Sequence, residues 1–186
     1  MTINKLFWAA RGFCYKASFG KFGNYSYIGK PSSLLGTKGI FVEDRVRIQP
    51  GIRIETANNG SIVIHENTSI GQNVHITADE EPLEIGKNTT ILGNTFITNL
   101  DHDYREIGIH IMDQKRIVHT TKIGENCFIG FGACIQAGTV LGKQCVVGAN
   151  AVVRGHFPDY SVIVGVPARV VKRYNPETKK WEKVDK

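Results

Sequence analysis

The segment NLDHDY places one histidine, His102, between two aspartates, Asp101 and Asp103. An imidazole titrates at about pH 6.5, so at neutral pH it can accept the proton of a hydroxyl group and later return it to a leaving group. A carboxylate is too weak a base for that step. Either aspartate, or a backbone carbonyl, could bind the second ring nitrogen and stabilise the imidazolium. The segment therefore indicates a general base for chemistry on a hydroxyl group.

Aliphatic residues recur at every sixth position over most of the chain. They form triplets: Val42, Ile48, Ile54; Ile64, Ile70, Ile76; Ile85, Ile91, Ile97; Ile123, Ile129, Ile135; Leu141, Val147, Val153. Neither a helix nor a plain alternating strand produces a period of six, whereas a β-solenoid with short strands and tight corners does. Each hexapeptide is therefore expected to form one flat side of a three-sided coil.

Two other positions of the hexapeptide fit this register. The third residue after the aliphatic one is often Asn or Gly, which tolerate left-handed backbone at corners. These residues are Asn67, Asn73, Asn88, Asn94, Asn126, Gly132, Gly138 and Asn150. The fifth position is commonly small or β-branched, which fits a second inward row. These residues are Thr68, Thr89, Thr95, Cys127, Ala133, Thr139, Cys145 and Ala151. Cys127 and Cys145 are one coil apart and are expected to stack in the core as free thiols.

The spacing is interrupted between triplets. The gaps are 10 residues from Ile54 to Ile64, 9 from Ile76 to Ile85 and 26 from Ile97 to Ile123. The first two are small bulges, and the third adds a loop over residues 101–120. A loop of that length in a compact scaffold is usually functional. His102 lies at its start, where a rigid coil would hold the ring beside a cleft, whereas His110 and His119 are expected to be surface or packing residues.

Composition excludes several classes of protein. The net charge is 23 − 17 = +6, and residues 1–42 contain no acid, so an anionic partner such as a cofactor phosphate or a membrane surface is expected. No helix-turn-helix, RNP-like or zinc-finger spacing supports nucleic acid. The four cysteines form no CxxC pair, which argues against a zinc or redox site. No apolar run is long enough for a membrane span, and we expect a cytoplasmic protein.

Residues 42–172 resemble the hexapeptide-repeat acyltransferases, and GVPAR (residues 165–169) resembles the segment that closes their coil. The resemblance implies an all-β, left-handed parallel β-helix. We therefore predict an N-terminal cap over residues 1–41, the β-helix domain with its loop over residues 42–172, and a basic C-terminal tail over residues 173–186.

The same resemblance implies roles for individual residues. His102 matches a loop histidine that deprotonates an acceptor hydroxyl, which then attacks the thioester of acetyl-CoA, with no metal required. Asn73 matches an asparagine of the acceptor pocket, although it also suits a corner for backbone reasons. Asp101 and Asp103 are further candidates on the acceptor side. Ala149, Arg154 and Lys172 match residues along the coenzyme. Arg169 and Arg173 are further phosphate-binding candidates because arginine binds phosphate with two parallel bonds.

The resemblance implies an acetyl-CoA-dependent O-acetyltransferase acting on a sugar hydroxyl in surface polysaccharide biosynthesis, with its coenzyme groove between the subunits of a homotrimer. Acetylation of an antibiotic or of the nitrogen of an amino sugar is an alternative. A metalloenzyme resembling γ-carbonic anhydrase is another, although no HxxxxH spacing occurs. A β-helix without catalysis, serving as a scaffold, is a third.

The first thirty residues do not follow the six-residue spacing and combine eight aromatic side chains with basic ones. A short helix over the open end of the solenoid would bury some of them and hide the exposed edge. Peripheral contact with a membrane surface is the second interpretation.

Overall fold

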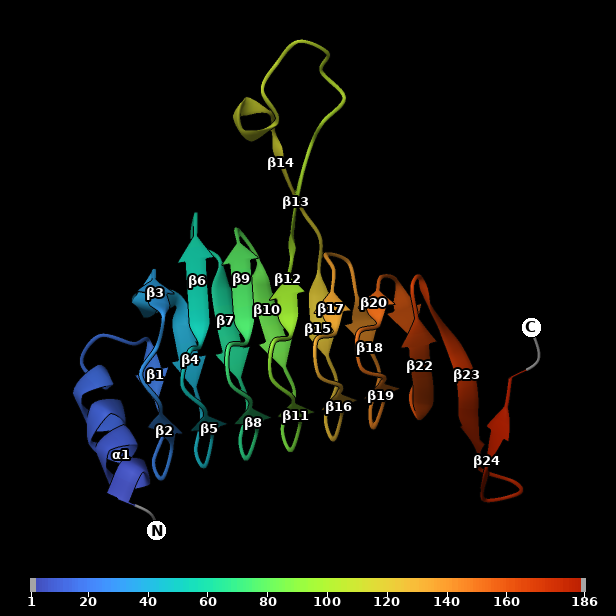
Figure 1. Cartoon of the computed structure of the whole chain (residues 1–186), viewed down its shortest axis with the longest axis horizontal. Helices are drawn as coiled ribbons and strands as arrows, with labels where there is room; N and C mark the ends of the chain where they lie inside the picture. The colour runs from blue at the N-terminus through green and yellow to red at the C-terminus, as the bar shows by residue number, and fades with distance from the viewer. Residues whose placement is uncertain (1–2, 185–186) are drawn as a thin grey trace.

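The computed structural model describes residues 3–184, and most of them form a three-sided parallel coil (Figure 1). Successive strands pass from one sheet to the next, and strands of neighbouring coils pair in parallel. A period of six residues gives this arrangement because each side holds one short strand and one corner. The parallel β-helix expected from the spacing is confirmed.

The three sides are sheets of seven, nine and six strands. The seven-stranded sheet contains β1 (Lys21–Phe22), β4 (Ile40–Val42), β7 (Ser61–Ile64), β10 (Pro82–Ile85), β15 (Thr121–Ile123), β18 (Val140–Leu141) and β21 (His156–Phe157). The nine-stranded sheet contains β2 (Tyr27–Ile28), β5 (Arg47–Ile48), β8 (Ser69–Ile70), β11 (Thr90–Ile91), β16 (Phe128–Ile129), β19 (Val146–Val147), β22 (Ser161–Gly165), β23 (Ala168–Asn175) and β24 (Lys180–Lys183). The six-stranded sheet contains β3 (Ser33–Leu35), β6 (Arg53–Ala57), β9 (His75–Asp79), β12 (Phe96–Thr98), β17 (Cys134–Ile135) and β20 (Val152–Val153).

The remaining elements lie outside the coil. They are α1 (Ile3–Tyr15), two short 3-10 helices, η1 (Thr37–Gly39) and η2 (Ile111–Asp113), and an antiparallel pair, β13 (Leu100–His102) and β14 (Arg116–Val118).

Both inward rows and the corners follow the predicted register. The aliphatic triplets are buried, and so are the eight small residues predicted for the second row, Cys127 and Cys145 included. All eight Asn and Gly residues predicted at corners have positive φ angles, between 54° at Asn73 and 80° at Gly138. All four cysteines are free. The hexapeptide pattern therefore gives the core and the turns together.

The coil begins earlier than the boundary predicted at residue 42. Strands β1, β2 and β3 pair with β4, β5 and β6, so residues 21–35 form a first coil and the cap consists of α1. Phe22, Ile28 and Leu34 keep the six-residue spacing there. The first position holds an aromatic residue in place of the usual aliphatic one, and the sequence GKPSS between the other two contains Gly and Pro, which are unusual inside strands.

The predicted tail over residues 173–186 also needs correction, because its boundary falls inside β23. Strand β23 pairs antiparallel with β22 and then with β24, and this hairpin extends the nine-stranded sheet (Figure 1). Trp181 of β24 packs against Tyr174 of β23, with ring centroids 5.8 Å apart. The hairpin covers the last coil at the end opposite α1.

Every insertion lies at one edge of the prism, where the six-stranded sheet passes to the seven-stranded sheet. This edge, called the insertion corner, carries residues 36–39, 57–60 and 79–81 in successive coils. The next coil carries the longest insertion, residues 99–120, called the excursion, which stands away from the coil (Figure 1). The excursion therefore rests on the insertion of the coil before it.

Candidate active site

His102 is the last residue of β13, at the root of the excursion. Strand β14 runs antiparallel beside it and places Arg116 directly opposite His102 and Ile117 opposite Asp101. Residues that face each other across antiparallel strands project from the same side, and successive residues alternate. His102 and Arg116 therefore share one face of the hairpin, and Asp101 projects from the other.

A buried carboxylate lies on the His102 face. Asp79, at the end of β9, is 1% exposed, and its Oδ2 accepts a hydrogen bond from Nη1 of Arg116 at 2.8 Å. Among residues 3–184, three buried side-chain polar atoms lack a hydrogen-bond partner, and two of them are Oδ1 of Asp79 and Nδ1 of His102. Such atoms are costly to bury and mark places where a structure serves a purpose other than stability. The sequence did not single out Asp79 or Arg116.

Asn99 fixes this root to the coil below. Its Oδ1 accepts from the backbone N–H of Asp79 at 2.9 Å, and its Nδ2 donates to the backbone carbonyls of Asp79 at 3.0 Å and Glu81 at 3.1 Å. Asn99 is fully buried. Because all of its amide group is engaged, the point where the chain leaves the coil is held rigidly.

Neither aspartate beside His102 forms a hydrogen bond with its ring. Oδ2 of Asp101 accepts from Nη2 of Arg154 at 2.7 Å and lies 3.8 Å from Nε2 of His119. Asp103 accepts from the side chain and backbone N–H of Arg105 and from the backbone N–H of Tyr104. The hydrogen bonds from Arg105 hold the pKa of Asp103 well below its usual range. Both carboxylates are thus engaged elsewhere.

On the far side of the hairpin, Arg154 borders an open cleft of about 670 Å³ at the insertion corner. His119, Gly138 and His156 also line this cleft. Because Arg154 is bonded to Asp101, the cleft and the root of the excursion are joined by an ion pair between residues 53 positions apart in sequence. His119, which was expected to be a surface or packing residue, therefore lines the cleft beside the root of the excursion.

Ala149 and Asn73 lie at a different corner, between the nine-stranded and six-stranded sheets. Ala149 is exposed between β19 and β20, and Asn73 is exposed just before β9. Asn73 has a φ of 54°, and its N–H donates to the carbonyl of Pro50. The full length of β9 separates Asn73 from Asp79, so the structure does not bring Asn73 to His102 within one chain.

The three basic residues of β23 divide between two faces. Arg169 pairs with Val164 and Lys172 with Val162, while a bulge between them takes up one residue. The bulge places Arg169 and Lys172 on the same outward face. Arg173, opposite the buried Ser161, projects from the other face. Among the described residues, neither Arg169 nor Lys172 pairs with an acid, so both can bind an anion such as a phosphate.

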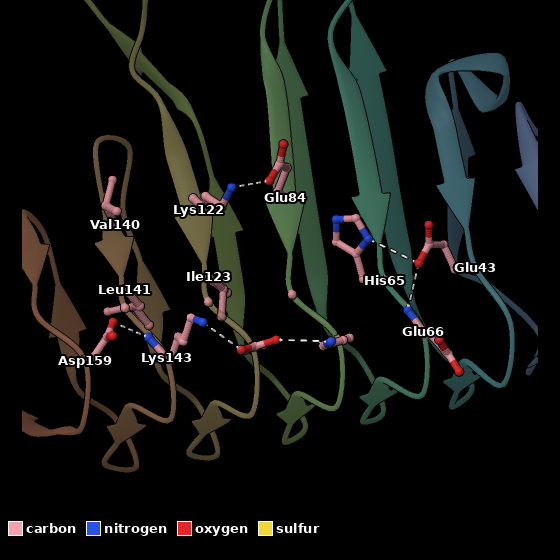
Figure 2. Close-up of a pocket in the computed structure, with 15 residues that line it drawn as sticks. Glu43, His65, Glu66, Glu84, Lys122, Ile123, Val140, Leu141, Lys143 and Asp159 are labelled. Carbon is pink, nitrogen blue, oxygen red and sulfur yellow. Dashed lines mark hydrogen bonds and ion pairs between the residues drawn. The ribbon is translucent and has the colours of Figure 1, made fainter.

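A second cleft, of about 460 Å³, runs along the seven-stranded sheet and contains none of the predicted site residues (Figure 2). Its charges pair with each other: Lys122 with Glu84 at 2.6 Å, Lys143 with Glu125 at 3.1 Å, and His65 with Glu43 at 3.2 Å. Asp159, at one end of the cleft, forms no ion pair among residues 3–184 and accepts a hydrogen bond from the backbone N–H of Lys143 at 2.8 Å. The cleft is best described as a ladder of surface ion pairs between coils.

Residues 3–184 contain neither a metal-binding cluster nor a membrane-spanning helix. No group of three His, Cys, Asp or Glu side chains in this range is arranged to hold a metal ion. None of the helices there combines the length and the apolar character needed to cross a membrane.

Comparisons with known proteins agree with this architecture. A family model described as hexapeptide repeat of succinyl-transferase matches residues 120–154. An Escherichia coli (strain K12) protein assigned to lipopolysaccharide biosynthesis as an O-acetyl transferase, WbbJ, is 37% identical over 142 residues, which cover 72% of this chain and 71% of that protein. Galactoside O-acetyltransferase of the same strain is 26% identical over 161 residues, covering 84% and 74%. AntD, a Bacillus cereus N-acyltransferase crystallised with dTDP and 3-hydroxybutyryl-CoA, shares the fold with a TM-score of 0.76 at 20% identity, covering 90% of each chain.

Proposed function

Since this chain belongs to the hexapeptide-repeat acyltransferases, we propose that it transfers an acetyl group from acetyl-CoA to a hydroxyl group of a sugar. The acceptor is a saccharide of a bacterial surface polysaccharide, by analogy with the lipopolysaccharide and galactoside O-acetyltransferases that it resembles. The observation that carries the proposal is the position of His102, on a root that Asn99, Arg116 and Asp79 hold to the coil.

The proposed step uses His102 as the general base. Nδ1 of His102 is buried, and Nε2 has no hydrogen-bond partner in the described residues, which leaves Nε2 to meet the substrate. The acceptor oxygen forms a bond to the carbonyl carbon of the thioester as its proton passes to Nε2. The tetrahedral intermediate then breaks its carbon–sulfur bond, and the imidazolium returns the proton to the sulfur. The products are a sugar acetate and CoA.

Asp79 supports this step as a positioning residue. A lone guanidinium directly across the hairpin from His102 would disfavour the imidazolium, because like charges repel. The carboxylate of Asp79 neutralises Arg116 at 2.8 Å. The pair therefore holds the strand of His102 without adding a net charge beside the ring.

The coenzyme would lie along the basic side of the prism. Arg169 and Lys172 carry unpaired positive charges on one face, where they suit the phosphate groups of CoA. Arg154 at the cleft and the exposed backbone at Ala149 suit the pantetheine arm. Asn73, Asp101 and Asp103 remain candidates for the acceptor side, and Asn73 would reach it only from a neighbouring subunit. We therefore include a homotrimer in the proposal, with exposed apolar residues such as Phe128 at the interface.

The test is release of free thiol from acetyl-CoA in the presence of a panel of saccharides, with the acetylated product identified by mass spectrometry. His102→Ala should lower kcat by roughly 10²–10⁴-fold, because it removes the general base. His110→Ala is the matched control, since His110 belongs to the same excursion but caps η2 by accepting from the N–H of Met112. Equal rates for His102→Ala and the unmodified protein would contradict the proposal.

A further inference from the structure

Helix α1 has apolar side chains on two opposite sides, and one of these sides is exposed to solvent. The packed side places Trp8 against Tyr27, with ring centroids 5.8 Å apart, and Gly12 so close to Phe22 that a Cβ atom would lie 2.7 Å from its ring. The opposite side, called the outer face, consists of Leu6, Phe7, Ala10, Phe13 and Cys14, all exposed. A helix with apolar residues on two opposite sides normally has contacts on both of them.

The exposure of the outer face is substantial. Leu6 is 55% exposed, Phe7 66% and Phe13 74%. Scattered apolar residues on a surface are ordinary, but a stripe with helical spacing on one element is a binding surface or a liability. The stability of the coil does not require these side chains, because Trp8, Gly12 and Tyr15 already attach α1 to the first coil and to Phe19.

Tyr25 extends this surface. It occupies a corner with a φ of 57° and is 91% exposed. Three later coils have Asn at this corner, at positions 67, 88 and 126, where left-handed backbone costs little, and the others have Arg45, Gln144 and Tyr160. Tyr160, the other aromatic residue at this corner, packs against Tyr174 with ring centroids 6.0 Å apart, whereas the ring of Tyr25 is almost fully exposed, so packing in the fold does not account for Tyr25. Phe13, Lys16 and Tyr25 border one cleft of about 400 Å³ between α1 and the first coil, which places them on the same side.

The segment that forms this surface is basic, although the next coil brings two acids to its edge: Asp44 accepts from the N–H of Asn24 at 2.8 Å, and Glu43 lies 3.8 Å from Lys21. Residues 1–42 include six basic residues and no acid. Lys16 is exposed, and its Nζ lies 5.9 Å from the ring of Phe13 and donates to Asn24 at 3.1 Å. Basic side chains that alternate with aromatic ones are typical of surfaces that rest on anionic lipid headgroups. A second copy of the chain is a poorer partner, because a two-fold contact would bring the two positive surfaces together.

We propose that the outer face of α1, with Tyr25 and Lys16, docks on the surface of an anionic lipid bilayer. The helix lies in the plane of the headgroups, with Phe7 and Phe13 in the acyl boundary. Its 13 residues span about 20 Å, too short to cross the bilayer. Because α1 covers one end of the solenoid and the excursion leaves its side, docking leaves the insertion corner free (Figure 1). The inference rests on this surface and is independent of the proposed reaction.

The test is co-sedimentation of the full chain with vesicles of 30% phosphatidylglycerol and 70% phosphatidylcholine. Binding to these vesicles is expected, with at least tenfold weaker binding to pure phosphatidylcholine and weakening as salt rises. Phe7→Ser with Phe13→Ser should lower the partition coefficient about 100-fold, roughly tenfold for each exposed ring removed. Ile107→Ser is the matched control, because Ile107 is 95% exposed but belongs to the excursion.

Unchanged far-UV circular dichroism and thermal unfolding in the double variant show that loss of binding is not loss of folding. Three outcomes overturn the proposal. Two are results of the sedimentation test: no sedimentation of the unmodified chain with anionic vesicles, or equal sedimentation of the double variant. A third is lipid-free self-association that the double variant abolishes in sedimentation velocity, since the outer face would then belong to a second copy of the chain.

Discussion

Arg116→Met tests whether the root of the excursion depends on a buried charge. The two ends of the ion pair lie in different surroundings, since the side chain of Asp79 is 2% exposed and that of Arg116 is 46% exposed. Removing Arg116 leaves a buried carboxylate without its counter-ion, whereas removing the charge of Asp79 leaves a guanidinium that water can still reach. The structure therefore predicts unequal costs for the two substitutions.

Breaking a buried ion pair from one side costs about 3–5 kcal/mol. Because water reaches half of Arg116, we expect the lower end, about 3 kcal/mol for Arg116→Met, or a fall in Tm of roughly 6–12 °C for a chain of this size. Asp79→Asn should cost about 1 kcal/mol, since the amide keeps a hydrogen bond to Arg116. In the double variant no charge is buried, so most of the loss should be recovered.

Chemical denaturation gives these free energies, and Lys122→Met is the matched control, because its partner Glu84 is 37% exposed and the pair should be worth less than about 1 kcal/mol. The pH dependence of the reaction rate gives a second measurement, which a change in stability alone would not affect. Asp79→Asn should shift the acidic limb of the pH–rate profile to lower pH, and Arg116→Met to higher pH, because one leaves a positive and the other a negative charge beside His102. Equal stability costs, or shifts in the same direction, would refute the reasoning.

Two further predictions concern the coenzyme face and the response to pH. Arg169→Ala and Lys172→Ala should each raise the KM for acetyl-CoA about tenfold by removing one charged hydrogen bond. Arg173→Ala, on the other face, should change this KM less than twofold. Steady-state kinetics of the three variants test this, and equal effects would contradict the placement of the residues by the bulge. Burial, and then the charge of Arg53, lower the pKa of His75, so the unfolded chain binds more protons and stability should fall as pH drops below about 6.5. Urea denaturation at several pH values should show that His75→Gln flattens this dependence, and an unchanged slope would count against it.

The six-residue spacing predicted the fold closely because a period of six residues directly determines the geometry of a three-sided coil. An inward residue every sixth position determines the side of the prism, and an Asn such as Asn67 or Asn126 determines the corner. The position of the excursion followed from one long gap in the spacing. The sequence did not predict the first coil, because Phe22 replaces the aliphatic residue that identifies each side in later coils.

The surroundings of His102 could not be predicted in the same way. Asp79 and Arg116 are 37 residues apart, and nothing in either local sequence indicates that they meet. They meet because insertions of successive coils stack at one edge, which depends on register rather than on composition. Conversely, Asp101 and Asp103 flank His102 in sequence, but alternation along β13 turns Asp101 away from the ring, and Asp103 accepts hydrogen bonds from Arg105 instead.

The stacking of insertions at one edge suggests how relatives of this protein could diversify. Each coil touches only the coils above and below, so residues added at that edge leave the pairing on the other two sides untouched. A longer or shorter segment can therefore replace an insertion at that edge and change the acceptor that the protein binds, while the pairing between coils stays the same.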